Sequence, residues 1–144
     1  MQDLAGRTAV ITGAASGIGL ALTERFVAAG MTVVMADVEE ETLAREATRL
    51  ESDGASVLGV LTDVRDSDAV EALRDQALSV YGSVHLVCNN AGVAPGGPMA
   101  DTTPADWRWA VDVNILGVAY GVTAFVPLML EQGEGHIVNT ASEA

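Results

Sequence analysis

Short apolar runs alternate with longer helical patterns along the whole sequence of 144 residues. The runs that predict strands are 8–12, 32–36, 56–61, 84–88 and 136–140. The patterns that predict helices are 17–29, 39–52, 67–81 and 104–132. Strands that alternate with helices are typical of βαβ units in a parallel sheet. The strands are apolar throughout rather than at every second position, which indicates that helices cover both faces of that sheet.

This pattern predicts a single α/β domain over residues 1–144, built as a Rossmann-like doubly wound parallel sheet. Right-handed crossovers between five strands give the strand order 3-2-1-4-5. The order reverses beside the first strand, and ligands bind at the carboxyl ends of the strands at such a crevice.

The first predicted strand leads into three glycines, Gly13, Gly17 and Gly19, and a helical pattern follows at once. A strand, a glycine turn and a helix together point backbone N–H groups and the positive end of a helix at a phosphate. A Cβ would obstruct the close approach of a pyrophosphate or force a strained φ. Three glycines in a loop also occur by chance, so the motif depends on the sheet that surrounds it.

Charge and composition exclude several functions. The net charge is −13, and the seven basic residues are all arginine, so the sequence contains no lysine. Such a surface repels nucleic acid, and a bound phosphate has to be held by backbone amides. No uninterrupted apolar run approaches the ~20 residues that span a bilayer, and the first residues lack a secretory pattern, so we expect no membrane partner. Cys88 is the one cysteine, which fits a cytoplasmic protein, and Cys88, His85 and His136 lack metal-ligand spacing.

Asp37 ends the second predicted strand, eighteen positions after Gly19. An acid at this place in a dinucleotide-binding unit accepts hydrogen bonds from the adenosine ribose and repels a 2′-phosphate, which favours NAD over NADP. The alternative is that Asp37 begins a turn or caps the following helix.

Other polar residues follow the third and fourth strands. Asp63 is placed to bond an adenine amino group, or to serve as a turn residue before the next helix. Asn89 and Asn90 are placed to brace the crevice or touch a ribose, whereas a simple turn accounts for Gly92 but not for two adjacent asparagines.

Two later residues have a choice of roles. Asn114 lies inside an apolar helix, where it either satisfies a neighbouring carbonyl or organises a proton path. Ser142 follows the fifth strand, where its hydroxyl either binds a substrate carbonyl or belongs to a turn.

The helix predicted over 104–132 has apolar residues on two sides. One stripe contains Trp107, Val111, Ile115, Val118 and Val122, and the other contains Trp109, Val113, Leu116, Tyr120 and Ala124. A helix on a sheet needs one such stripe, so the second is expected to meet more of this chain or another subunit. Pro127 predicts a kink or an early end near Val126.

Together these residues resemble the short-chain dehydrogenase/reductase family from Gly6 to the end of the sequence. The matching segments are Thr12 to Gly19 (with Gly13, Ser16, Gly17 and Ile18), Asp37, Asp63-Val64, Asn90-Ala91-Gly92, Asn114, and Gly135 to Ser142. The resemblance implies that all but the last two segments bind NAD, with NADP less favoured. It also implies two catalytic residues. Asn114 would belong to a proton relay, and Ser142 would orient the substrate oxygen.

The family's tyrosine, four residues before a lysine, has no counterpart here, because neither Tyr81 nor Tyr120 has a basic residue four positions on. We therefore expect the N-terminal part of an NAD(H)-dependent oxidoreductase, without the family's C-terminal strands and helices. Such a part would bind cofactor and turn over negligibly. The parent enzyme would transfer hydride between nicotinamide and an alcohol or carbonyl substrate. We also expect a homo-oligomer through the helix face over 104–132.

Two alternatives are a non-catalytic dinucleotide-binding module or partner subunit, and a flavodoxin-like receiver or electron carrier. The second is disfavoured because no acidic cluster surrounds the end of the first strand.

Overall fold

A computed structural model describes residues 3–142 as a five-stranded parallel sheet in the order β3-β2-β1-β4-β5. The strands are β1 (Thr8–Thr12), β2 (Thr32–Asp37), β3 (Val57–Leu61), β4 (Leu86–Asn89) and β5 (His136–Asn139). The helices are α1 (Gly17–Ala28), α2 (Glu40–Ser52), α3 (Ser67–Tyr81), α4 (Pro104–Val111) and α5 (Gly117–Gln132). The predicted fold class and strand order are confirmed.

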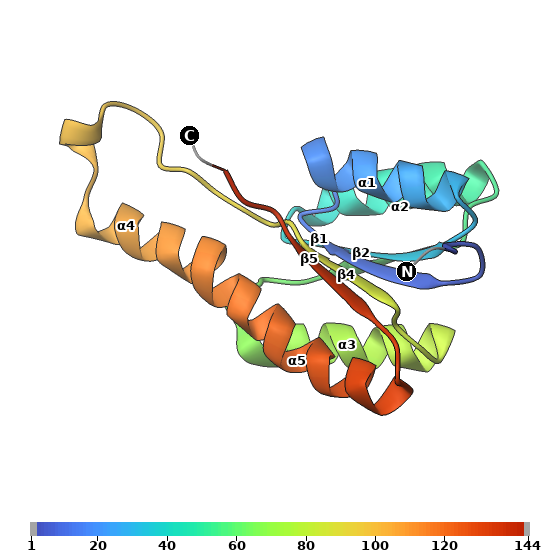
Figure 1. Ribbon diagram of the computed structural model, residues 1–144. Coiled ribbons are helices and arrows are strands. Elements are labelled where there is room, and N and C mark those ends of the chain that lie inside the picture. The colour runs from blue at the N-terminus through green and yellow to red at the C-terminus, as the bar shows by residue number, and fades with distance from the viewer. Residues whose placement is uncertain (1–2, 143–144) are drawn as a thin grey trace.

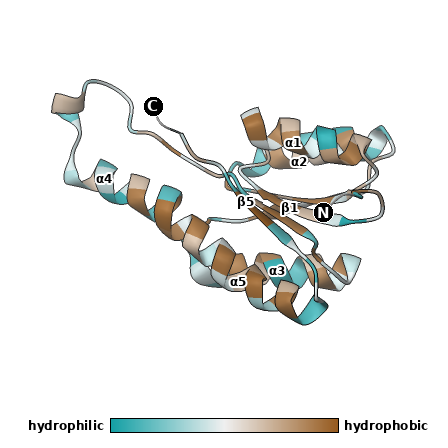
Figure 2. Cartoon of the chain, viewed as in Figure 1, coloured by the Kyte–Doolittle hydropathy of each residue, from teal (hydrophilic) through white to brown (hydrophobic). Residues whose placement is uncertain are grey.

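Helices cover both faces of the sheet, with α1 and α2 on one side and α3 and α5 on the other (Figure 1). Each face has its own buried cluster of side chains, one around Ile11 and Met35, the other around Val10 and Phe125. Neighbouring residues of β1 point to opposite faces and both are fully buried. This arrangement explains why β1 is buried at every position and apolar at its three central ones. Figure 2 shows apolar residues where helices meet the sheet.

The strand ends differ slightly from the prediction. β4 begins at Leu86 rather than at Val84. The Val84 N–H donates to the Gln132 side chain (3.3 Å), and the backbone bonds to the neighbouring strands begin at His85. β2 continues to Asp37, which pairs with Leu61 of β3.

The long helix predicted over 104–132 is present but is not uniform. A short 3₁₀ turn (Met99–Asp101) precedes α4, and a π-helical turn (Asp112–Leu116) joins α4 to α5. The early end predicted near Val126 is wrong, since α5 continues through Pro127 to Gln132. Proline removes one helix hydrogen bond, and the burial of Phe125 and Met129 on either side of it holds this turn against the sheet.

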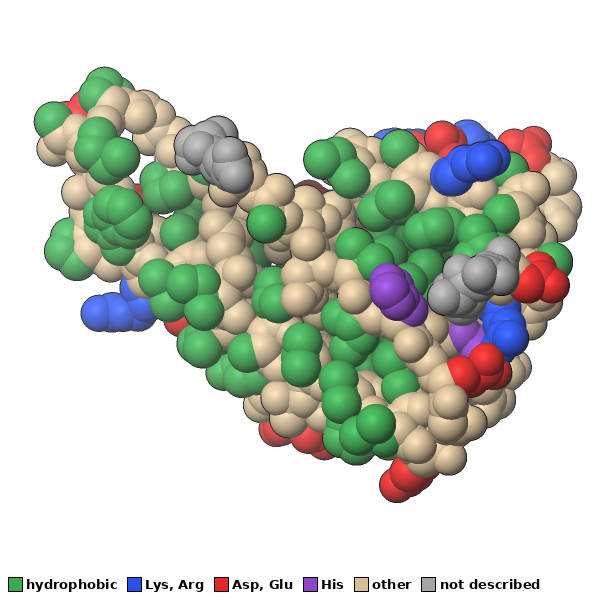
Figure 3. All heavy atoms as spheres, viewed as in Figure 1, with side chains coloured by type: hydrophobic (Ala, Val, Ile, Leu, Met, Phe, Trp, Pro, Cys, Tyr) green, Lys and Arg blue, Asp and Glu red, His purple; other side chains and the backbone are tan. Residues whose placement is uncertain are grey.

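The two apolar stripes of this helical segment have different surroundings. Val113 and Ala124 of the second stripe are buried in the core. Three residues of the first stripe, Trp107, Val111 and Ile115, are exposed, Ile115 to 60 %. Hydrophobic side chains also gather over α4 and α5 on the face seen in Figure 3. The second stripe is therefore only partly covered, since Trp109 and Leu116 stay exposed. The first stripe is uncovered from Trp107 to Ile115 within residues 3–142, and its later members are half-buried.

The segment Pro104–Gln132 is long and apolar enough to cross a membrane by length and composition, with a mean hydropathy of 1.8 in its most apolar window. A third of that window is buried inside the protein, and core helices commonly pass the same test. This is weak evidence, and the absence of a membrane partner stays a prediction.

Candidate nucleotide-binding site

The glycine loop between β1 and α1 is shaped by contacts that only glycine allows. Gly13 and Gly17 have φ values of +66° and +53°. A Cβ on Gly19 would lie 2.0 Å from the Gly13 carbonyl oxygen, so the first turn of α1 packs directly on the loop. The loop therefore exposes backbone at the N-terminus of a twelve-residue helix, the place where a phosphate binds most readily.

Asp37 ties the end of β2 to this loop. Its Oδ2 accepts a hydrogen bond from the Ala15 N–H (2.9 Å), and its Oδ1 accepts one from the Glu39 N–H (3.1 Å). The second bond is the turn that sequence reasoning offered as the alternative to ribose binding. The two roles are compatible, because each carboxylate oxygen has a second lone pair and Asp37 lines the cavity described below.

Asn90 bridges the crevice between β1 and the end of β5. Its Nδ2 donates to the Thr12 carbonyl (3.1 Å), and its Oδ1 accepts from the Thr140 hydroxyl (3.1 Å). The Thr12 hydroxyl accepts in turn from the N–H groups of Asn90 and Ala91 (3.0 Å each). Asn89 is buried and donates to the Asn139 side chain (2.9 Å). The two adjacent asparagines thus brace the crevice, one of the alternatives that their sequence suggested.

Asp63 forms an ion pair with Arg65 at the end of β3. Oδ2 of Asp63 lies 2.6 Å from Nη2 of Arg65, and the Arg65 backbone N–H donates to Oδ1 (3.0 Å). These hydrogen bonds lower the pKa of Asp63 and raise that of Arg65. Asp66, not Asp63, caps α3 through the Asp68 N–H. Asp63 is therefore a turn residue that also lines the cavity, and its bond to an adenine amino group stays a prediction.

Asn114 lies in the π-helical turn and holds the irregular segment that follows β4. Its Oδ1 accepts from the Val93 N–H and its Nδ2 donates to the Val93 carbonyl, both at 2.8 Å. Of the two predicted interpretations, pairing with a neighbouring backbone group is the one with geometric support; a proton path through Asn114 stays a prediction.

A cavity of about 570 Å³ opens at the carboxyl ends of β1, β2, β3 and β4. Ten of the predicted residues line it: Gly13, Ser16, Gly17, Ile18, Asp37, Asp63, Val64, Asn90, Ala91 and Gly92. Gly19, Asn114 and Ser142 are not among its lining residues, since Gly19 is buried under the loop and Ser142 lies exposed beyond β5.

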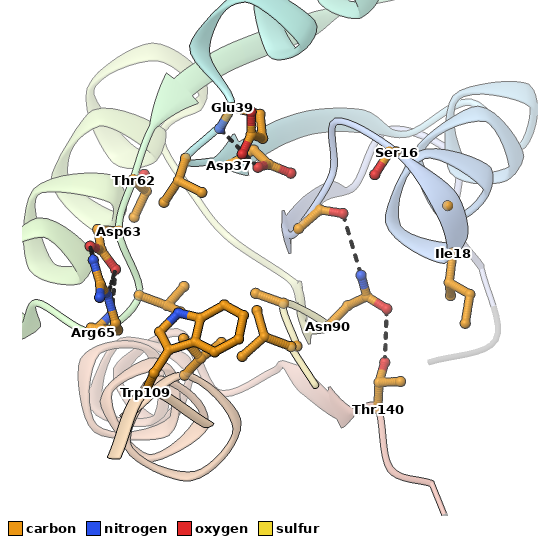
Figure 4. A pocket seen from close by; sticks show the side chains of 18 residues that line it. Ser16, Ile18, Asp37, Glu39, Thr62, Asp63, Arg65, Asn90, Trp109 and Thr140 are labelled. Atoms are coloured by element: carbon orange, nitrogen blue, oxygen red, sulfur yellow. Dashed lines mark hydrogen bonds and ion pairs between the residues drawn. The ribbon is translucent and has the colours of Figure 1, made fainter. Parts of the chain in front are cut away.

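The cavity also has walls that sequence reasoning missed. Trp109 and Arg65 are the most prominent of these, and Figure 4 shows both beside the space bounded by Asp37 and Asn90. Trp109 and Val113 both line the cavity and are four residues apart on one helical segment. That spacing could have identified Trp109 as a cavity wall. Cys88 lies outside the cavity, where burial raises the pKa of its thiol to about 11 and keeps it unreactive.

The comparisons with known proteins agree on one family. Residues 7–144 match the family described as short chain dehydrogenase. The 1-deoxy-11-beta-hydroxypentalenate dehydrogenase of Streptomyces arenae is 47% identical over 139 residues, covering 94% of this chain and 49% of that protein. The 3beta-hydroxysteroid dehydrogenase 2 of Eggerthella lenta is 40% identical over 141 residues, covering 96% and 54%.

A solved structure is similar over the same residues. The short chain dehydrogenase/reductase of Burkholderia phymatum in complex with NAD is 50% identical, with a TM-score of 0.95, and the match covers 99% of this chain and 51% of that one. The chain thus spans about half the length of the relatives that it matches.

Proposed function

This chain belongs to the short-chain dehydrogenase family, and on that premise we propose that it is the dinucleotide-binding part of an NAD(H)-dependent oxidoreductase. The observation that carries the proposal is the cavity in which the glycine loop, Asp37 and the Asn90 bridge meet. In the whole enzyme, hydride would pass between the nicotinamide and an alcohol or carbonyl substrate.

The residues around the cavity fit a dinucleotide. A Cβ on Gly13 would lie 2.9 Å from the Ala91 Cα, so the loop offers its backbone where a side chain would obstruct a pyrophosphate. Asp37 is already held by two backbone N–H groups and keeps free lone pairs for ribose hydroxyls. When bound, the nicotinamide ring accepts or donates the hydride, and the residues of this chain bind and orient the molecule.

NAD is the preferred cofactor in this proposal. Asp37 and Glu39 both line the cavity beside the expected ribose, and Arg65 is paired with Asp63 at another wall. Two unit charges about 4 Å apart repel by roughly 4 kcal/mol at an effective dielectric near 20. Even a quarter of that energy makes NADP bind several-fold more weakly.

Beyond the cavity, we propose that Asn114 acts by holding Val93 and that Ser142 orients the substrate oxygen. The 144 residues include no lysine, so the family's tyrosine–lysine pair is not available and this chain alone should turn over negligibly. We further propose a cytoplasmic homo-oligomer that binds neither nucleic acid nor membranes.

Parallel titrations with NADH and NADPH, in which the fluorescence of the reduced nucleotide reports binding, test the proposal. We expect saturable binding of NADH at least several-fold tighter than that of NADPH. Asp37→Ser should weaken NADH binding and narrow the difference in affinity between NADH and NADPH. Asp53→Ser, a change at the exposed end of α2, should leave the affinities for both nucleotides unchanged. Failure of either nucleotide to bind would overturn the proposal. NADH formation from an alcohol by the 144-residue chain alone would contradict the prediction of negligible turnover.

A further inference from the structure

We propose that Trp109 stacks on the adenine base and thereby covers the adenosine end of the cavity. The inference rests on the proposed function, since it assigns one further residue to the same dinucleotide site.

Trp109 is placed by helix geometry to face the cavity. It lies on α4 one turn before Val113, and side chains four residues apart share one helix face. Val113 is buried and Trp109 is 38 % exposed, and both line the cavity. Figure 4 shows the indole extending from α4 into the space between the Asp63–Arg65 pair and Asn90. The indole therefore forms a partly open wall of the cavity rather than part of the core.

The wall lies at the end where the base is expected. Asp37 ends β2, and β3 is the next strand outward from the central β1. A nucleotide with its pyrophosphate on the glycine loop and its ribose on Asp37 therefore points its base toward the end of β3. Asp63 and Val64 are located there, and Val64 belongs to the same buried cluster as Val113, the neighbour of Trp109.

The chemistry of this end matches a purine. Val64 and Val113 provide an apolar floor. The Asp63 carboxylate also lies at this end, but its oxygens already accept from the Nε, Nη2 and backbone N–H of Arg65, so a purine amino group would have to take the place of one of these bonds. Within residues 3–142, Trp109 is the one aromatic side chain that lines the cavity. An aromatic ring attracts the π-face of any base, so the indole supplies the stacking surface that the other walls lack.

Trp107 provides an internal comparison. It is two residues from Trp109, so the two side chains leave the helix in roughly opposite directions, and Trp107 does not line the cavity. The sequence contains two tryptophans in all, and Trp107→Phe therefore leaves Trp109 as the single indole reporter.

The first test uses the Trp107→Phe chain and two halves of the dinucleotide. ADP-ribose, which carries the adenine, should quench or shift the Trp109 emission in a saturable way. Nicotinamide mononucleotide at the same concentrations should not. A calorimetric titration run in parallel reports whether each compound binds at all.

The second test measures ADP-ribose affinity in variants. Trp109→Leu should weaken binding about 5- to 20-fold, and Trp109→Phe should restore most of the loss, because stacking needs an aromatic face rather than bulk. Trp107→Leu should not change the affinity. Bound ADP-ribose with an unchanged Trp109 signal, or an unchanged affinity in folded Trp109→Leu, would overturn the inference and leave the proposed function standing. Failure of the unmodified chain to bind ADP-ribose would overturn both.

Discussion

Single atoms of individual residues decide the shape of the nucleotide site. The missing Cβ of Gly19 lets α1 start against the Gly13 carbonyl, and the Thr12 hydroxyl accepts two N–H groups across the crevice. These contacts join β1 to the segment after β4, two parts of the chain 78 and 79 residues apart. The loop is thus held by the crevice as well as by its own sequence.

Gly19→Ala should damage both binding and stability. The added Cβ would lie 2.0 Å from the Gly13 carbonyl and 2.8 Å from the Asn90 amide, so the loop has to move. We expect a loss of about 1–3 kcal/mol in the free energy of unfolding and a loss of at least tenfold in NADH affinity. Urea denaturation and NADH titration measure the two effects.

Gly96→Ala is the matched control for this change. Gly96 has no positive φ and no heavy atom within 4 Å of an added Cβ. Its substitution should change stability by less than about 0.5 kcal/mol and leave NADH binding intact. If Gly19→Ala binds NADH as well as Gly96→Ala does, the close approach at Gly19 is not needed for binding.

At the scale of elements, the π-helical turn and the segment after β4 depend on each other. Asn114 uses both ends of its amide on the backbone of Val93, although the two residues are 21 positions apart. A π-helical turn shifts the residues that follow it relative to an unbroken α-helix, and such turns are common at functional sites. The turn is where the helical segment meets the wall of the crevice.

Asn114→Ala should release Val93 without unfolding the helix. Two hydrogen bonds are lost at an exposed place, so we expect a cost of about 1–2 kcal/mol in stability. Hydrogen exchange at the Val93 amide should accelerate markedly. The Ala91 amide, which donates to Thr12, should keep its protection. Unchanged exchange at Val93 would show that Asn114 does not hold this segment.

At the other end of β4, His85 makes stability depend on pH. Its Nδ1 accepts from the Thr8 N–H (3.1 Å), and Arg7 and Glu134 lie nearby, joined in an ion pair. Burial, with a smaller contribution from Arg7, lowers the pKa of His85 below 6.5, against an opposing effect of Glu134. The unfolded chain therefore binds the proton more readily than the folded chain does.

The contribution of His85 to stability should be complete above about pH 7.5 and should decline as the pH falls through 6.5. Urea midpoints between about pH 5 and 8 measure this decline. His85→Phe should flatten the part of the profile near pH 6, whereas substitution of the exposed His136 by alanine should preserve it. A profile unaltered by His85→Phe would assign the dependence to other groups.

Most elements could be predicted from sequence, because apolar periodicity and glycine position are local signals. The π-helical turn could not, because apolar periodicity does not distinguish it from an α-helix, and the contact that Asn114 makes within it is to a backbone group outside the helix. The helix was predicted to end at Gln132, as it does, but the early end that Pro127 suggested near Val126 is wrong, because tertiary packing around Pro127 outweighs the local effect of proline. In the site, the glycine loop and Asp37 follow from motif spacing. The Arg65 partner of Asp63 and the Trp109 wall depend on contacts between distant elements.

At the scale of the whole molecule, the uncovered apolar stripe on the long helical segment is the main departure from a closed surface. Trp107, Val111 and Ile115 are exposed side by side along one helix face. Contiguous apolar surface of this kind commonly marks an interface between proteins.

We predict that the chain associates through this stripe. In sedimentation velocity, the unmodified chain should show a species larger than the monomer, 14.8 kDa, and Ile115→Glu should shift the population toward monomer because a charge is costly to bury. Val80→Glu replaces an equally exposed apolar residue on α3 and serves as the control. An equal shift toward monomer in both variants would show that the stripe is not the interface.

The strand order also determines when each edge of the sheet is closed during synthesis. β1 finds its partner β2 only 24 residues later, but its other side waits for β4, 77 residues along the chain. Through that interval a strand with an apolar centre has one unpaired edge, the kind of edge that templates pairing with other chains. The crevice lies along this late edge. The crevice is therefore complete only once the ribosome has delivered β4, and a nucleotide bound as proposed would contact both of its sides only from that point.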